Sequence, residues 1–272
     1  MGRKLRTTPT SDLQGNTKKT TSLKEKQEPK RVGVIGAGAI CSLIASACEK
    51  GLVKCDELIV YDSDKNAAEK LKGSTRFPVT LVPSFNRLLD AHPSVVVEAA
   101  SQQAAKEYVP RLAEANFEVI VMSTGALLQL QELGINVHVP SGAIGGLDAL
   151  SAAALAGVDE VTLTTRKNPR ALDMNNREEQ LVYEGSAEEA ASRFPREMNV
   201  AATLALTVKP AKVKVKVISD PSVERNTHEI HVKWRYGEIF LRFANDPHPE
   251  NPRTSALAAW SAIQLLQKLL ES

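Results

Sequence analysis

The sequence contains no run of about 18 consecutive apolar residues, the length that a membrane-spanning helix needs. Residues 1–30 also lack the continuous apolar core of a secretory signal, so we expect neither a membrane span nor a signal peptide. Cysteine is scarce: Cys41, Cys48 and Cys55 are the only three. An odd number of cysteines this close together favours reduced thiols in a cytoplasmic protein over a disulfide framework. Their spacing also predicts no metal site.

A strong charge of one sign is absent from most of the chain. Residues 1–31 contain nine Lys or Arg and three Asp or Glu. The rest of the chain contains 25 Lys or Arg and 29 Asp or Glu. A mildly acidic globular part lacks the basic surface that is typical of nucleic-acid binding. The basic segment 1–30 has too few apolar residues to form a core, and we expect a disordered tail there.

The most informative segment that is present reads VGVIGAGAIC, at residues 32–41. A strand-like apolar run leads into Gly36 and Gly38, and a helical pattern follows over residues 42–50. Gly36 permits a tight turn, and Gly38 lets the backbone approach a pyrophosphate at the start of the helix. Cys41 stands where Gly or Ala is usual, and it is small enough to pack helix against strand. The expected cofactor-binding positions here are Gly36, Gly38, Ala39 and Ile40.

An acidic residue ends the second predicted strand, at 58–61. Asp62 lies 26 residues after Gly36, where dinucleotide-binding proteins place an acid on the ribose hydroxyls. Its charge would repel a 2′-phosphate and so favours NAD, while Ser63 and Lys65 leave NADP use open. The alternative is an Asp that only caps a turn or a helix.

Strand and helix patterns alternate from residue 31 to residue 140, which predicts a doubly wound parallel sheet of the Rossmann type. Ligands of such sheets bind at the carboxyl ends of the strands. Polar or small residues end two more predicted strands, with Ala100 and Ser101 after the strand at 95–100 and residues 123–126 after the strand at 119–122. We therefore expect a cleft there, although such residues also form ordinary turns.

The pattern changes after Pro140. A glycine-rich crossing, 140–148, leads to five predicted strands (160–166, 180–184, 212–219, 227–234 and 238–245) with few helices between them. This predicts a second, smaller α+β domain with a mostly antiparallel sheet. A final helix is expected from Thr254 to Leu270, opened by Asn251–Ser255 and packed on the first domain. The expected parts are residues 1–30, 31–140, 141–250 and 251–272.

These motifs together resemble those of the NadX-type L-aspartate dehydrogenase family. The matching stretches are 36–40, 97–102, 123–126, 140–148, 199–204, 226–230 and 250–256, which span nearly all of residues 31–272 in the right order. The resemblance implies a Rossmann domain joined to a smaller domain that binds substrate and mediates assembly into a homodimer or homotetramer. It also implies oxidation of L-aspartate by NAD(P)⁺ to iminoaspartate, which hydrolyses to oxaloacetate and ammonia or feeds de novo NAD biosynthesis.

The resemblance also assigns roles to single residues. Ala126 and Asn199 match cofactor-contacting positions of the family, and His228 matches its active-site histidine. From the residues alone, His228 and His231 are equal candidates, because residues three apart on a strand point to opposite faces. For the same reason the two cannot share a metal. A histidine suits the proton and water steps of amine oxidation.

A dicarboxylate substrate needs cationic partners. Arg166, Lys167, Arg225 and Arg253 lie near the ends of predicted elements, and each taken alone is more typical of a solvated charge. The N–H groups that open the predicted final helix are another anion site. Asp148 either orients the substrate ammonium or caps a helix. The alternatives to the family function are another amino-acid or semialdehyde oxidoreductase, such as a homoserine dehydrogenase, and a non-catalytic NAD-binding sensor.

Overall fold

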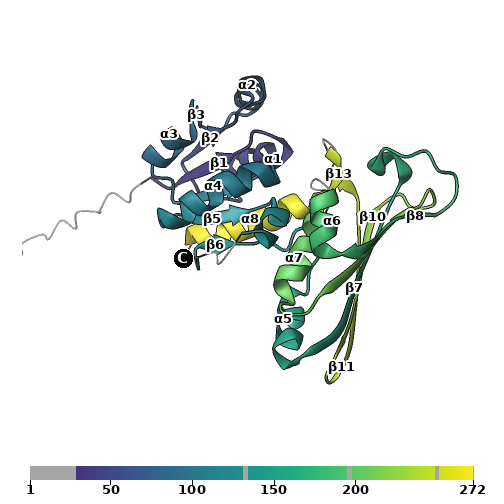
Figure 1. The fold of residues 1–272 in the computed structure, drawn as a ribbon. Helices are drawn as coiled ribbons and strands as arrows, with labels where there is room; N and C mark the ends of the chain where they lie inside the picture. Colours follow the sequence, from purple (N-terminus) through teal and green to yellow (C-terminus); the bar gives the residue numbers. More distant parts are fainter. Residues whose placement is uncertain (1–28, 131–133, 195–197, 249–250, 272) are drawn as a thin grey trace, which may run out of the picture.

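The structure is a computed structural model that describes residues 29–130, 134–194, 198–248 and 251–271. It contains two large sheets with helices packed on them (Figure 1). The expected disordered tail, residues 1–30, lies outside the described residues except for its last two. None of the helices that the structure describes has both the length and the apolar character to cross a membrane.

The first sheet has six parallel strands in the order β3-β2-β1-β4-β5-β6. The order reverses between β1 and β4, as it does in a doubly wound fold, so the predicted Rossmann sheet is confirmed. Its strands are β1 (Arg31–Ile35), β2 (Glu57–Tyr61), β3 (Val79–Leu81), β4 (Val95–Glu98), β5 (Glu118–Val121) and β6 (Val137–His138). The segments between and after them form α1 (Ala39–Glu49), α2 (Lys65–Ser74), α3 (Phe85–Asp90), α4 (Gln102–Glu114) and the 3₁₀ helix η1 (Thr124–Leu128).

The central strands are continuous apolar runs because helices cover both faces of the sheet. Val34 and Val97 point into a core shared with α1, whereas Ile35 and Val96 point into the opposite core with α3 and α4. Glu98, the last residue of β4, is buried as completely as the valines before it. This charged residue at the carboxyl end of a core strand has a specific set of partners, described below.

The second sheet has the order β11-β10-β7-β9-β8. Only the β7–β9 pair is parallel, so the predicted mostly antiparallel sheet is confirmed. Helices α5, α6 and α7 provide the apolar residues that cover one face. The elements are α5 (Leu147–Ala156), β7 (Val158–Lys167), the 3₁₀ helix η2 (Pro169–Leu172), β8 (Gln180–Ser186), α6 (Ala187–Arg193), α7 (Asn199–Thr207), β9 (Val213–Ser219), β10 (Asn226–Trp234) and β11 (Gly237–Asn245).

The chain then returns to the first sheet through α8 (Ala256–Glu271), whose residues Ala262, Ile263 and Leu266 join the core around α1 (Figure 1). The predicted start of this helix is wrong. Residues Asn251–Ser255 form strand β13, which pairs with β12 (Pro247–His248), and the helix begins at Ala256. The physical reason is that the pairing with β12 keeps the backbone extended as far as Ser255.

Gly36 determines the shape of the first strand-to-helix turn. Its φ of 102° lies in the left-handed region, and a Cβ at this position would be 2.8 Å from the carbonyl oxygen of Ala99. The turn therefore packs directly against the backbone at the end of β4, which only glycine allows.

We predict that Gly36→Ala destabilises the protein by about 1–3 kcal/mol, because the variant combines an unfavourable φ with a backbone clash. Gly73→Ala is the matched control. Gly73 lies inside α2 with open space around it, and alanine there should be neutral or stabilise by up to about 1 kcal/mol. Thermal unfolding of both variants tests this, and equal melting temperatures would contradict the assignment of strain to Gly36.

Candidate active site

The glycine turn and the end of β2 meet as the sequence predicts. Asp62 accepts a hydrogen bond from the backbone N–H of Ala37 at 2.6 Å, and a second from the N–H of Asp64 at 2.8 Å. A small cavity of about 250 Å³ lies between Gly36, Asp62 and Ser101. Gly38 is exposed at the N-terminus of α1, and a Cβ there would meet nothing within 4 Å. Space beside the helix N-terminus thus remains for an anion.

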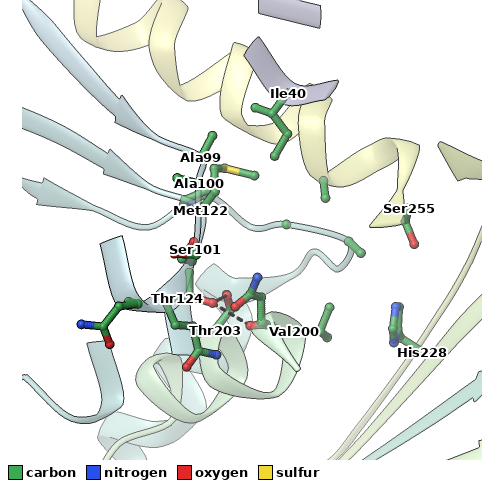
Figure 2. A pocket seen from close by; sticks show the side chains of 18 of the residues that line it. Ile40, Ala99, Ala100, Ser101, Met122, Thr124, Val200, Thr203, His228 and Ser255 are labelled. Atoms are coloured by element: carbon green, nitrogen blue, oxygen red, sulfur yellow. Dashed lines mark hydrogen bonds between the residues drawn. The ribbon is translucent and has the colours of Figure 1, made fainter. Parts of the chain in front are cut away.

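A large cavity of about 760 Å³ continues from this region (Figure 2). Ala100 and Ser101 border both cavities, so these strand-end residues lie between them. Ile40 and Met122 contribute apolar side chains from the first domain, and His228 lies across from them on the second sheet (Figure 2). An elongated ligand with a polar end and a reactive end matches two adjoining cavities of this kind.

Glu98 connects the two loops that border the large cavity. Its Oε1 accepts hydrogen bonds from the N–H groups of Ala100 and Ser101 at 3.0 and 3.1 Å and from Ser123 Oγ at 3.0 Å. Its Oε2 accepts one from the N–H of Ser123 at 3.1 Å. Burial raises the pKa of this carboxyl group, and the four hydrogen bonds oppose the rise. The side chain thereby holds the ends of β4 and β5 in one arrangement.

Sequence reasoning missed Glu98. The signal that could have identified it is a single acidic residue inside the apolar run 95–100, where an unpaired charge would be costly. A buried carboxylate that accepts four hydrogen bonds explains why the strand tolerates it.

His228 lies on β10 with its side chain 3% exposed. Its Nδ1 is 3.0 Å from Oγ1 of Thr165 on the paired strand β7, which leaves Nε2 as the ring nitrogen for a molecule in the cavity. Burial lowers the pKa of His228, the nearby charge of Lys167 acts in the same direction, and together they bring it to about 3. The imidazole is therefore neutral near pH 7. His231 lies on the opposite face of the strand, half exposed and paired with Glu238, so the structure separates the two candidates.

Lys167 is the cation that the structure brings to the cavity. It is 3% exposed and lies two residues beyond Thr165, on the same face of β7. Arg166 points to the other face, where it pairs with Glu179 and Asp220. Arg225 pairs with Asp246 at the surface. The side chain of Arg253 lies outside the described residues. The interpretation of Lys167 as a solvated charge is therefore wrong, because strand alternation places it in the interior.

Asn199, at the start of α7, borders the large cavity and is held in place at both ends. Its backbone carbonyl accepts a hydrogen bond from Thr124 Oγ1 at 2.8 Å, and its side-chain oxygen accepts one from the N–H of Gly125 at 3.3 Å. Ala126 is fully buried two residues after Thr124, and its side chain packs in the first-domain core without bordering either cavity. Asn199 and Ala126 are thus brought to the same loop region, but only Asn199 reaches the cavity surface.

Two binding sites expected from the sequence are placed differently in the structure: the ammonium site at Asp148 and the anion site at the start of the final helix. Asp148 is exposed in the first turn of α5 and does not border the cavity, although Gly142 and Ala143 of the same crossing do. The helix N-terminus predicted at Thr254 begins two residues later, and Ser255 borders the cavity instead. Within the described residues no group of three or more His, Cys, Asp or Glu could hold a metal ion.

Two known protein families match the sequence, one over each sheet. The sequence profile described as "Homoserine dehydrogenase, NAD binding domain" matches residues 32–135, and the profile "Aspartate dehydrogenase, C-terminal" matches residues 148–269. The first match covers the Rossmann sheet as far as β5, and the second covers the sheet that carries Lys167 and His228. Fold and profiles together define an NAD-binding oxidoreductase with two domains.

Individual relatives identify the family. The L-aspartate dehydrogenase of Methanothermobacter thermautotrophicus is 40% identical over 253 residues, which cover 89% of this chain and 96% of the relative. The L-aspartate dehydrogenase of Archaeoglobus fulgidus is 39% identical over 250 residues, which cover 88% of this chain and 98% of the relative. The crystal structure of aspartate dehydrogenase from Thermotoga maritima matches with a TM-score of 0.69 and 30% identity. The match covers 90% of this chain and 97% of that structure's chain. The chain belongs to the L-aspartate dehydrogenase family.

We predict that burial of His228 makes stability depend on pH. The unfolded chain binds a proton at this residue near pH 6.5, whereas the folded protein binds it only near pH 3, so stability should fall as the pH is lowered between these values. His228→Gln should reduce the loss of melting temperature between about pH 7 and about pH 4.5 by several degrees. His231→Gln, on the exposed face, is the control. Thermal unfolding that shows the same pH dependence in all three proteins would refute the assignment.

Proposed function

We propose that the protein oxidises L-aspartate with NAD⁺ to iminoaspartate, NADH and a proton, and that the imine then takes up water to give oxaloacetate and ammonia. The observation that carries this proposal is the large cavity, in which a buried cation and a neutral histidine face the strand ends of a Rossmann sheet. Family membership supports the same reaction.

The cofactor fits the two adjoining cavities. Asp62 would take the ribose hydroxyls, and the open space at Gly38 would take the pyrophosphate. Ala100, Ser101 and Asn199 would then border the reactive end in the large cavity. When bound, the nicotinamide supplies a hydride acceptor. Asp62 favours NAD, and exposed Ser63 and Lys65 leave NADP use open.

His228 is the proposed acid–base residue. Oxidation of an amine requires a deprotonated amino group, and hydrolysis of the imine requires a water molecule that loses a proton. An imidazole that is neutral near pH 7 can accept the proton of the substrate ammonium, release it to solvent and then accept a proton from the attacking water. The hydrogen bond between Nδ1 and Thr165 fixes the ring, so that Nε2 stays directed to the substrate.

Lys167 is the proposed partner of a substrate carboxylate. A buried ammonium group favours an anionic ligand, because the ligand replaces the hydration that burial removes. Lys167 and His228 border the same cavity, so one substrate could contact both. Aspartate has two carboxylates and one amine, which matches a site with a cation and a proton acceptor.

Further parts of this proposal concern assembly and context. We propose a homodimer or homotetramer in the cytoplasm, with a role in de novo NAD biosynthesis, and a division of the chain into residues 31–140, 141–250 and 251–272. Large apolar side chains exposed on the second domain support assembly through that domain: Leu155 is 93% exposed, Tyr236 70% and Phe240 63%. Exposed apolar surface of this kind is common at subunit interfaces.

The first test is turnover with L-aspartate and NAD⁺, followed by NADH absorbance. We expect NADH to appear with L-aspartate and not with homoserine. His228→Gln should lower kcat at least about tenfold while the Kd of NAD⁺ stays within about twofold, because acid–base residues contribute about 10²- to 10⁴-fold. Turnover with another amino acid alone would refute the substrate, and tight NAD⁺ binding without any turnover would favour a sensor.

The second test separates Lys167 from other lysines. Lys167→Met should lower kcat/KM for L-aspartate about 10- to 100-fold, as expected for the loss of a charged hydrogen bond. The affinity for NAD⁺ should not fall. Lys216→Met is the matched control, because Lys216 lies on the adjacent strand β9 and is 38% exposed. Equal kinetics in the two variants would show that Lys167 does not bind the substrate.

A further inference from the structure

Two of the three cysteines lie against each other at the end of α1. Cys48 is the next-to-last residue of the helix, and Cys55 lies in the segment that leads to β2. Their Sγ atoms are 3.2 Å apart. Neither residue belongs to the glycine turn or borders either cavity, so the function proposed above leaves this pair unexplained.

Backbone hydrogen bonds between Cys48 and Cys55 bring the two sulfur atoms close together. Gly51 has a φ of 70°, and its N–H donates to the carbonyl of Cys48 at 2.9 Å. The N–H of Leu52 donates to the carbonyl of Ala47 at 2.9 Å, which closes the helix end tightly. A compact turn of six residues, 49–54, therefore brings the two sulfur atoms together.

The two thiols differ in exposure and acidity. Cys48 is 5% exposed, and its Sγ shares a hydrogen bond with the Sγ of Cys55, which is half-buried. That hydrogen bond lowers the pKa of Cys55 and raises the pKa of Cys48. Cys41 is fully buried, and burial raises its pKa to about 12. A reachable thiol with thiolate character and an adjacent second thiol form the arrangement of a redox pair.

We propose that Cys48 and Cys55 are a thiol-oxidation site that reacts with a small disulfide such as oxidised glutathione to form a reversible intramolecular disulfide. The Cys55 thiolate attacks one glutathione sulfur, forms a mixed disulfide and releases one glutathione thiolate. Cys48 then loses its proton and attacks the Cys55 sulfur, which releases the second glutathione. The protein loses two protons and two electrons, and oxidised glutathione takes them up to become two glutathione thiols.

The position of the pair predicts what oxidation does. Cys48 lies nine residues beyond Ala39, so it is about 14 Å along the helix from the glycine turn. Oxidation should therefore leave the Kd of NAD⁺ unchanged within about twofold. It should raise the melting temperature, because the new bond joins α1 to the segment before β2 and limits the unfolded chain.

The test is a mass measurement on the full-length protein. Protein incubated with oxidised glutathione is treated with iodoacetamide, and we expect a loss of the mass of two hydrogens and one alkylated thiol. Trypsin cuts after Lys50 and Lys54, so the disulfide should link the two separate peptides 32–50 and 55–65. Reduction with dithiothreitol should restore all three thiols.

Single variants assign the bond. Cys41→Ser should still form it, whereas Cys48→Ser should stop at a mixed disulfide that adds one glutathione to peptide 55–65. Cys48→Ala replaces Cys48→Ser if the latter is unfolded, as judged by NAD⁺ binding. Three alkylated thiols in the treated wild type, a stable mixed disulfide in the wild type, or an internal disulfide in Cys48→Ser would each overturn the proposal. A linked peptide pair that persists in Cys41→Ser supports it.

Discussion

The carboxylate of Glu98 is the interaction on which the candidate active site depends. Four donors from two separate strand ends converge on it, and each of them lies in a loop that borders the large cavity. A buried carboxylate without partners would destabilise the fold, and without the carboxylate the N–H and hydroxyl groups of buried Ser123 would lose their acceptor. The carboxylate and the loops therefore stabilise each other. Gly36 adds to this arrangement, since its lack of a side chain lets the first turn contact the backbone of Ala99 at the end of the same strand.

The second sheet provides the opposite wall, and its polar residues are arranged by strand geometry. Thr165 and Lys167 are two residues apart on β7, and His228 pairs with Thr165 across the ladder, so all three side chains lie on one face. Burial of the lysine and the histidine on a single face has a cost that apolar residues would not have. Burial, aided by the charge of Lys167, suppresses protonation of the imidazole, which remains neutral. An anionic ligand at this face would offset the cost of the buried cation.

Local patterns were sufficient for the Rossmann half and insufficient for the details of the site. The glycine turn, Asp62 and the alternation of strands and helices are short-range signals, and the structure has them where the sequence predicts them. Alternation along β7 puts Lys167 on the same face as Val161 and Leu163, but that this face borders a cavity depends on segments far away in the sequence. The helix start near Thr254 was misplaced for a related reason, since residues 251–255 pair with β12. The role of Glu98 depends on Ser123, 25 residues away in the sequence.

The two walls of the large cavity are joined by two crossings of the chain that contact each other. The chain leaves the first sheet through residues 140–146 and returns through β13 and α8, and the N–H of Gly142 donates to Ser261 Oγ at 3.0 Å. Gly142, Ala143 and Ser255 border the cavity directly, so the crossings form part of its surface. Helix α8 packs in the core around α1, the helix that begins at the glycine turn. The returning crossing is therefore fixed to the first domain. The packing of α8 in the first-domain core thus helps to set the distance between the two walls of the cavity.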